Sequence, residues 1–331
     1  MNNEFEITNK INKLNELKKS KNAVILAHYY TLPEVQNSAD FLGDSLFLAQ
    51  KAKEIQAEII IFCGVNFMAE TAKILNPTKK VLIPDNNSFC SLADSVDFAV
   101  FLNWKNSFEN PYLISYINCS TEVKAISDVI CTSANVLKIA ESAPKNSTIL
   151  FATDENLGNW VNKKLNLNMK LWKGNCVVHQ NFSEENLNKK IKQFSKAKVV
   201  AHPECPENIL KYADFIGSTT GILNFITKNF AEEKPENNIK NSIKNKFIIL
   251  TETGISHQLK KMNKNSSDRN FIFVEGKNPN GNICFNMKNN TLDKMISALE
   301  NQNLESEIEI DENLRIAALK PLEKMLTLSN I

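Results

Sequence analysis

One arrangement of strands and helices occurs three times along this chain, and it constrains the fold more than any other feature. Each copy is an apolar strand, a polar turn, a short helix and a second short apolar stretch that ends in small hydroxyl residues. The copies read AVILAHYYTLPEVQNSADFLGDS, PYLISYINCSTEVKAISDVICTSAN and KVVAHPECPENILKYADFIGSTTG. Short β-rich runs that alternate with helical patterns are typical of α/β units with parallel sheets. The sequence therefore predicts an α/β fold built from three similar units.

Each copy continues in the same way, which strengthens the case for a repeat. A strand that runs into a small polar turn and an amphipathic helix follows each time: IIIFCGVNFMAETAKILNP, ILFATDENLGNWVNKKLN and FIILTETGISHQLKKMNK. A last strand then ends in a loop that carries a cysteine: Cys90 in VLIPDNNSFC, Cys176 in KLWKGNC and Cys284 in FIFVEGKNPNGNIC. The alternative is ordinary α/β alternation with an accidental cysteine in each unit. The repeated position makes that the weaker explanation.

The repeat divides the chain into three units with an extension at each end. A chain of 331 residues, 43% of them hydrophobic, can bury a sizeable core, and its length favours two or three domains. We expect αβα repeats over 22–105, 106–195 and 196–300. A helix over 4–20 and a helical segment over 301–331 are expected to pack on this body.

The charge balance points to a small-molecule partner. The 39 basic and 37 acidic residues leave a formal charge of +2, too little for a strong field toward nucleic acid or an anionic membrane. Apolar runs stay far below the roughly 18 residues of a membrane span, and the polar start MNNEFEITNK shows no targeting pattern. We therefore expect a cytoplasmic protein with no nucleic-acid or membrane partner.

The seven cysteines are an odd number and include no CxxC pair. In a reducing compartment such cysteines are buried thiols or metal ligands. Because ligands gather at the carboxyl ends of parallel strands, the three repeated loops would bring their cysteines to a shared centre. We assign no ligand role to the remaining cysteines, which are Cys63, Cys119, Cys131 and Cys205.

Three thiolates at one centre suit a metal with an open position. They can hold a [4Fe-4S] cluster at three irons and leave the fourth iron free as a Lewis acid, which suits dehydration or condensation. Zinc with three thiolates and a water, which suits hydrolysis, is the alternative. The residues alone do not distinguish an iron–sulfur cluster from zinc.

Polar side chains gather near the predicted strand ends. His28, His202 and His179 are expected at strand ends, and His179 follows Cys176 by three residues. Glu204 follows an apolar strand. We expect burial to raise the pKa of Glu204 and make it an acid or base; the alternative is a helix N-terminal carboxylate beside Pro206. The other polar candidates at this edge are Tyr30, Tyr116 and Asn118.

Hydroxyl-rich stretches open a helix in every unit. Arg269 and Arg315 are the only arginines, so an anionic substrate must be held mainly by other groups. Hydroxyls at helix starts suit carboxylates or phosphate, although simple N-capping explains them too, and the two roles are compatible. The candidates are Ser45, Ser133, Ser218 and Thr219.

At these residues the chain resembles quinolinate synthases nearly from end to end. The segments that carry the resemblance are AHYYTLPEVQ, ADFLGDSLFLA, FCGVNFMAETAKIL, CSLADS, YINCSTEVKAISDVICTSANV, FATDENLG, WKGNCVVH, AHPECP, ADFIGSTTGI, TETGISHQL and ALKPLEKML. The resemblance implies three αβα domains around a pseudo-threefold axis, with the active site and a [4Fe-4S] cluster where they meet. It also implies de novo NAD biosynthesis by condensation of iminoaspartate with dihydroxyacetone phosphate, releasing phosphate and two waters to give quinolinate.

The resemblance carries the family's site residues onto this chain. Cys90, Cys176 and Cys284 become the cluster ligands, and functional coupling to an L-aspartate oxidase that supplies iminoaspartate is expected. The predicted catalytic residues are Tyr30, Tyr116, His202 and Glu204. The predicted substrate-binding residues are His28, Ser45, Tyr116, Asn118, Ser133, His179, His202, Glu204 and Thr219.

Two departures from the family pattern and two rival functions complete the predictions. Phe89 stands before the first ligand where a small residue is expected, and no CxxCxxC run surrounds Cys284. The first rival function is an α/β receptor for a small anion, which would bind its ligand without turnover. A cluster-based sensor would keep the three cysteines but would not need Tyr116 or Glu204.

Overall fold

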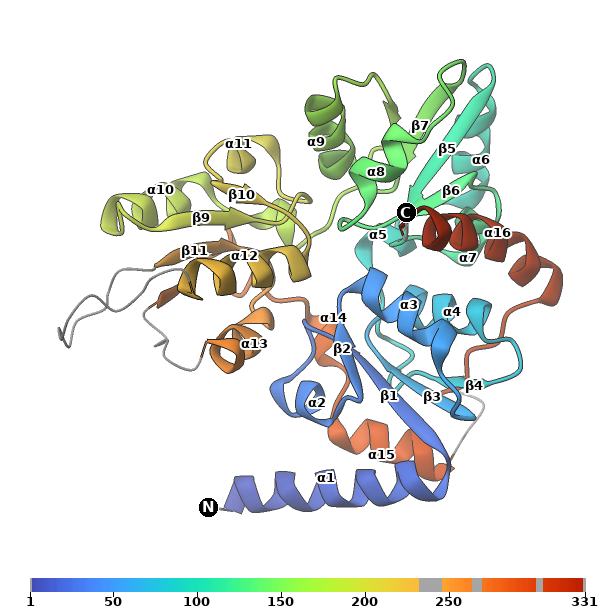
Figure 1. The fold of residues 1–331 in the computed structure, drawn as a ribbon, viewed down its shortest axis with the longest axis vertical. Coiled ribbons are helices and arrows are strands. Elements are labelled where there is room, and N and C mark those ends of the chain that lie inside the picture. Colours follow the sequence, from blue (N-terminus) through green and yellow to red (C-terminus); the bar gives the residue numbers. More distant parts are fainter. Residues whose placement is uncertain (1, 232–245, 264–269, 302–305, 330–331) are drawn as a thin grey trace.

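The computed structural model confirms the predicted α/β class. It describes residues 2–231, 246–263, 270–301 and 306–329, and it contains three parallel four-stranded sheets. Figure 1 shows them as three lobes around a common centre. Among the described helices, none combines the length and apolar composition needed to cross a bilayer.

The three sheets share one strand order. In each, the first strand pairs with the second and third, and the fourth lies outside the third, giving the orders β2-β1-β3-β4, β6-β5-β7-β8 and β10-β9-β11-β12. The repeat predicted from the sequence is therefore a repeat of structure. The strands are β1 (Ala23–His28), β2 (Phe41–Gly43), β3 (Ile59–Cys63), β4 (Lys80–Leu82), β5 (Pro111–Tyr116), β6 (Val129–Cys131), β7 (Thr148–Ala152), β8 (Lys170–Leu171), β9 (Lys198–Ala201), β10 (Phe215–Ile216), β11 (Phe247–Leu250) and β12 (Phe271–Phe273).

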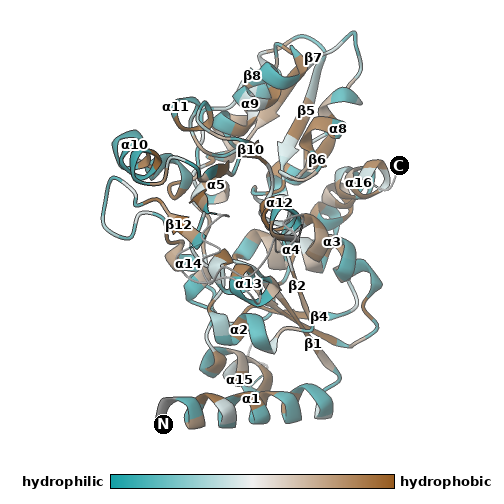
Figure 2. Cartoon of the chain, turned by 60° about the vertical axis from the view of Figure 1, so that its left-hand side comes forward, coloured by the Kyte–Doolittle hydropathy of each residue, from teal (hydrophilic) through white to brown (hydrophobic). Residues whose placement is uncertain are grey.

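The central strands are apolar throughout because helices cover both faces of each sheet. Every residue of β3 and β11 is buried. Continuous apolar runs of this kind are what a strand buried on both faces requires. Figure 2 shows the hydrophobic colour along strands such as β1 and the hydrophilic colour along α10 (Glu184–Gln193), which lies at the surface.

The helices connect consecutive strands, and several begin at a residue that caps them. Asp44, Asp97, Ser120, Asp154 and Ser183 each accept a hydrogen bond from the amide three residues later. The helices between strands are α2 (Pro33–Ser38), α3 (Ser45–Glu54), α4 (Asn66–Leu75), α5 (Ser91–Asp94), α6 (Phe98–Asn106), α7 (Thr121–Ala125), α8 (Val136–Glu141), α9 (Glu155–Leu165), the 3₁₀ turn η1 (His179–Asn181), α11 (Glu207–Leu210), α12 (Thr219–Ala231) and α13 (Ile255–Met262).

The N-terminal helix packs on the first unit, and the C-terminal helix joins two units. The expected N-terminal helix is α1 (Asn2–Ser20), and the expected C-terminal helical segment contains α16 (Glu312–Ser329); residues 302–305 and 330–331 of that segment lie outside the described residues. Helix α16 packs on α7 and α8 of the second unit and on α4 of the first. Its buried Arg315 donates to the carbonyl of Ile74 at 3.1 Å, so the C-terminal helix joins two units.

One helix lies outside the unit to which its residue numbers assigned it. Helix α15 (Leu292–Asn301) falls in the predicted third repeat, yet it packs beside α1 and shares a core cluster with the first sheet (Figure 1). Buried Met295 and Leu299 belong to the same cluster as Ile25. We propose that the third domain ends before α15 and that the other predicted boundaries hold.

Candidate active site

The carboxyl edges of the three sheets surround one cavity. It has about 840 Å³ of space between protein atoms, part of it open to solvent. The structure brings every predicted ligand and site residue except the candidate Ser218 to its wall. These are His28, Tyr30, Ser45, Cys90, Tyr116, Asn118, Ser133, Cys176, His179, His202, Glu204, Thr219 and Cys284.

Strand pairing shows that these side chains occupy repeated positions. Ala27, Ser115 and Ala201 pair with the last residues of the third strands of their sheets, so the residues that follow them are equivalent. Those next residues are His28, Tyr116 and His202, and two residues further on stand Tyr30, Asn118 and Glu204. A symmetric scaffold thus carries an asymmetric set of side chains.

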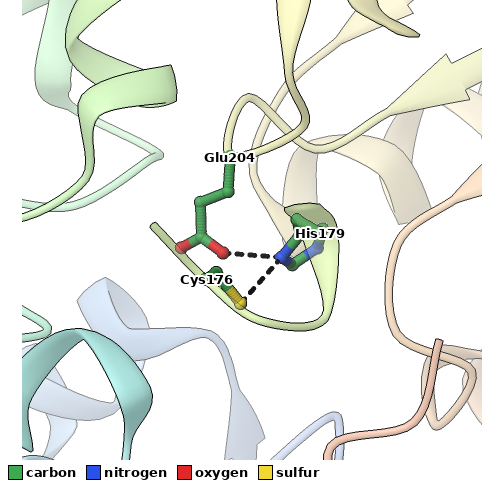
Figure 3. Close-up of side chains that lie close together, drawn as sticks. All are labelled: Cys176, His179 and Glu204. Atoms are coloured by element: carbon green, nitrogen blue, oxygen red, sulfur yellow. Dashed lines mark hydrogen bonds and ion pairs between the residues drawn. The ribbon is translucent and has the colours of Figure 1, made fainter. Parts of the chain in front are cut away.

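The Glu204 carboxylate is the centre of the polar network. Its Oε1 accepts from the Tyr116 hydroxyl at 2.6 Å, and its Oε2 lies 2.6 Å from Nδ1 of His179 (Figure 3). Burial acts to raise the pKa of Glu204, but His202, His179 and the hydrogen bond from Tyr116 bring it well below its ordinary value. The predicted raised pKa is therefore wrong. The capping alternative also fails, because the side chain faces His179 and Tyr116.

The two strand-end histidines are held as neutral rings. Burial lowers the pKa of His28 to about 4 and that of His202 to about 3. Nδ1 of His28 accepts from the Tyr30 amide at 3.2 Å, and Nδ1 of His202 accepts from the Glu204 amide at 3.4 Å. The single ring proton then sits on Nε2, which in His202 lies 3.2 Å from the Ser133 hydroxyl.

Tyr30 and His179 meet at a residue that sequence reasoning missed. The Tyr30 hydroxyl lies 2.7 Å from the Thr251 hydroxyl and 2.9 Å from that of Thr219. Thr251 also lies 3.0 Å from Nε2 of His179. His179 begins the turn η1 and does not end a strand as predicted, because the cysteine loop carries it back over the cavity. Burial raises the pKa of Tyr30 and of Tyr116 well above the usual value.

The hydroxyl residues divide between capping and lining. Ser218 accepts from the Gly221 amide at 3.2 Å and contacts Asp44, which itself caps α3. In the third unit Ser218 therefore caps the helix, as predicted for a hydroxyl, whereas in the first unit the cap is the carboxylate of Asp44. The hydroxyl residues that line the cavity are Ser45, Ser133 and Thr219.

Each repeated cysteine stands just before a helical turn. Cys90 precedes α5, Cys284 precedes α14 (Phe285–Lys288), and Cys176 lies shortly before η1. Backbone amides of these turns point at the sulfurs and lower the pKa of the thiols: Leu92 and Ala93 at Cys90, His179 at Cys176, Asn286 and Met287 at Cys284.

The thiols are close enough to influence one another. Burial raises the pKa of Cys90 to about 12, that of Cys284 to about 11 and that of Cys176 well above its usual value. The charges of Glu204, Cys90 and Cys284 further raise the pKa of Cys176. Such thiols lose their protons only when a cation compensates the charge. Three converging sulfurs with amides aimed at them fit a metal–thiolate centre.

Comparison with known proteins decides the family. The sequence profile described as "NadA: Quinolinate synthetase A protein" matches residues 12–327. The chain belongs to the quinolinate synthetase A family. This confirms the resemblance drawn from the motifs.

Similar proteins named quinolinate synthase align over almost their whole length. The protein of Cyanophora paradoxa is 46% identical over 321 residues, 97% of this chain and 92% of the relative. That of Chloroherpeton thalassium is 46% identical over 319 residues, 96% and 94% respectively. That of Synechocystis sp. is 45% identical over 320 residues, 96% and 95% respectively.

Three carboxylates, two of them buried, hold the cysteine loops of this quinolinate synthetase A chain, and none was predicted. The amide of Cys90 donates to Asp94 at 2.6 Å, that of Cys176 to Asp154 at 3.2 Å and that of Cys284 to Glu252 at 3.2 Å. Asp154 and Glu252 both follow the third strand of their sheet by two residues. Alignment of the repeats in the sequence could have revealed these two acidic residues at one shared position.

A second set of metal donors overlaps the cysteines in this family member. Ligand atoms of Cys176, His179 and Glu204 all lie within 4.8 Å of one another (Figure 3). They come from one thiol, one imidazole and one carboxylate, a combination that suits a single zinc ion. The donor groups by themselves are therefore compatible with either an iron–sulfur cluster or zinc.

The remaining cysteines take no part in the cavity. Cys63, Cys119, Cys131 and Cys205 are all fully buried, and within the described residues none of them lines the cavity. Cys205 contacts the carbonyl of Leu250 at 3.5 Å. These four thiols therefore lie apart from the three cysteines that line the cavity.

Apolar residues complete the cavity wall and were not predicted. Phe89, the departure from the family pattern, lies in the wall with 48% of its surface exposed. Apolar side chains near neighbouring helices and loops carry no chemical signal in the sequence, so only packing reveals them. The others are Val65, Phe67, Met68, Val177, Val178 and Met287.

Proposed function

We propose that this chain is a quinolinate synthase of de novo NAD biosynthesis. It would condense iminoaspartate with dihydroxyacetone phosphate and release phosphate and two waters. The observation that carries the proposal is the convergence of three repeated cysteine loops and a His–Tyr–Glu network on one cavity, in a chain of this family.

Cys90, Cys176 and Cys284 would hold a [4Fe-4S] cluster. When bound, such a cluster with three thiolate ligands supplies an open iron that acts as a Lewis acid toward a substrate oxygen. The three repeated loops support this choice over zinc, because the Cys176–His179–Glu204 set would leave Cys90 and Cys284 without a role.

Neutral donors would hold the anionic groups of the substrates. Ser45, Ser133 and Thr219 offer hydroxyls, and His28 offers an Nε2 proton from a ring that burial keeps neutral. Asn118 supports the assignment independently, because its buried Oδ1 has no hydrogen-bond partner within the described structure. A substrate N–H or O–H group would satisfy that oxygen.

Glu204 and the residues around it would move protons. The Glu204 carboxylate, with its pKa lowered, would accept a proton in ionised form, and Tyr116 and His179 each lie 2.6 Å from it. Tyr30 and His202 face the same cavity from the first and third units and would serve the other proton transfers. His179 would orient Glu204 and contact substrate.

The test is to purify the protein without oxygen and measure iron, sulfide and visible absorbance in wild type, Cys284→Ala and Cys205→Ala. We expect about four irons per chain in wild type and Cys205→Ala, and loss of the broad absorbance in Cys284→Ala. Zinc, or no metal, in the wild type would overturn the cluster.

Turnover separates the enzyme from its rivals. Wild type supplied with dihydroxyacetone phosphate and with iminoaspartate made by an L-aspartate oxidase, the coupling we propose for the cytoplasm, should form quinolinate. Binding without product would favour the anion receptor. A cluster-dependent signal that survives Glu204→Gln would favour the sensor.

A further inference from the structure

The Thr251 hydroxyl lies where the three units meet, and it has no role in the function proposed above. Thr251 directly follows β11 in the third unit and is fully buried. Its Oγ1 lies 2.7 Å from the hydroxyl of Tyr30, from the first unit, and 3.0 Å from Nε2 of His179, from the second. Tyr30 in turn lies 2.9 Å from Thr219.

The Thr251 hydroxyl can hold both neighbours at once. A hydroxyl has one proton to donate and lone pairs that accept, so Thr251 can donate to one of the two groups and accept from the other. The His179 ring is then held at both nitrogens, because its Nδ1 lies 2.6 Å from the Glu204 carboxylate.

The Tyr30 hydroxyl is likewise held at two points. It lies between the hydroxyls of Thr251 and Thr219, both buried. Thr251 is therefore the one residue that contacts both the Tyr30 hydroxyl and the His179 ring among the hydrogen bonds described above.

We propose that Thr251 is a positioning residue that fixes the place of the Tyr30 hydroxyl and the ring orientation of His179. Thr251 does not line the cavity, so it acts through these two residues. Its effect on turnover rests on the proposed function, whereas its effect on the two side chains does not.

Two pairs of variants isolate the hydroxyl from the shape of the side chain. Thr251→Val keeps the volume and removes the hydroxyl, and Thr251→Ser keeps the hydroxyl and removes the methyl. If Thr251→Val does not fold, Thr251→Ala compared with Thr251→Ser again differs only in the hydroxyl. Thr227→Val on α12 is the matched control, since the Thr227 hydroxyl has no hydrogen-bond partner in the described structure.

The kinetic readout is the split between kcat and KM. We expect Thr251→Val to lower kcat by about 10-fold or more with KM within about twofold, and Thr251→Ser to restore most of kcat. A merely structural residue would show no such rescue. Wild-type kcat in Thr251→Val, or no gain from serine over alanine, would overturn the proposal.

Crystal structures of the same variants test the inference without turnover. We expect the His179 ring or the Tyr30 hydroxyl to move away from position 251 in Thr251→Val and to keep its place in Thr251→Ser. Unmoved side chains in Thr251→Val would sink the inference even if the enzyme is active. An inactive wild type with the expected movements would sink the proposed function alone.

Discussion

Residues at equivalent places in the three units have diverged into different chemical roles. The strand-end position holds His28, Tyr116 and His202, and the position two residues later holds Tyr30, Asn118 and Glu204. The backbone delivers all six to one cavity. The identity of each side chain then decides whether it donates, accepts or carries charge.

Glu204→Gln should test the central carboxylate. The amide keeps the size and can still accept one hydrogen bond, but it cannot accept a proton from substrate. We expect kcat for quinolinate formation to fall by about 100-fold or more, with a much smaller change in KM. Glu207→Gln, on the exposed face of α11, is the control and should match wild type. A Glu204→Gln enzyme with normal kcat would remove Glu204 from the proton-transfer steps.

Burial of His28 predicts a pH dependence of stability. The folded pKa is about 4 and the ordinary value is 6.5, so between these values the unfolded chain binds more protons than the folded one. Stability is therefore full above pH 6.5 and is lost as the pH falls toward 4, by about 3 kcal/mol for this one group.

Urea unfolding at a series of pH values checks this prediction. His28→Gln has no proton to bind, so its free energy of unfolding should fall less steeply between pH 6.5 and 4 than that of wild type. Parallel curves for the two proteins would show that His28 is not buried as a neutral ring.

At the scale of elements, the loop between β12 and α14 depends on one buried ion pair. Glu252 is fully buried and accepts from the amides of Cys284 and Gly254, and Lys288 lies 2.9 Å from it. Lys288 also donates to the carbonyl of Tyr30, which joins the third unit to the first. A Cβ on Gly254 would lie 2.8 Å from the Tyr30 Cα, so this close approach requires glycine.

Lys288→Ala should destabilise the protein because it leaves a buried carboxylate without its cation. We expect the free energy of unfolding to fall by about 3 kcal/mol, and a Lys288→Ala/Glu252→Gln double variant to recover part of the loss. Urea midpoints measure both effects. Lys163→Ala breaks the exposed pair with Glu207 and should leave the midpoint unchanged. Equal midpoints for Lys288→Ala and wild type would contradict the prediction.

At the scale of the whole molecule, the cavity depends on all three units at once. Each unit supplies one cysteine loop. Helix α16 packs against both the second and the first unit, and α15 packs on the first unit. A metal centre held by three thiolates, one from each unit, would link the three units only in the folded state. Its binding free energy therefore adds to the stability of the whole assembly.

Removal of the metal should lower the melting temperature. Protein purified without oxygen and then stripped by oxidation and chelation should melt roughly 5 °C or more below the loaded protein. Cys284→Ala should show little response to the same treatment, which makes it the control. Scanning calorimetry before and after reconstitution measures the difference, and equal melting temperatures would argue against a shared centre.

The sequence alone determined the class of fold and predicted the cysteines and polar side chains that the structure brings to the cavity wall. Alternating apolar and amphipathic segments specify strands and helices locally, and a threefold repeat with a cysteine at one place specifies that three loops face a common centre. Cys90, Cys176 and Cys284 were identifiable for that reason. The strand-end position of His28 and His202 follows from the same periodicity.

Only the tertiary structure decided what surrounds each group and therefore how it behaves. The pKa of Glu204 moves opposite to the predicted direction because His202 and two residues remote in the chain, His179 and Tyr116, outweigh the effect of burial. The place of α15 and the role of Thr251 likewise depend on contacts between units. Local sequence encodes the periodicity of one segment, whereas electrostatics and hydrogen bonding depend on distances between segments that only the folded chain brings together.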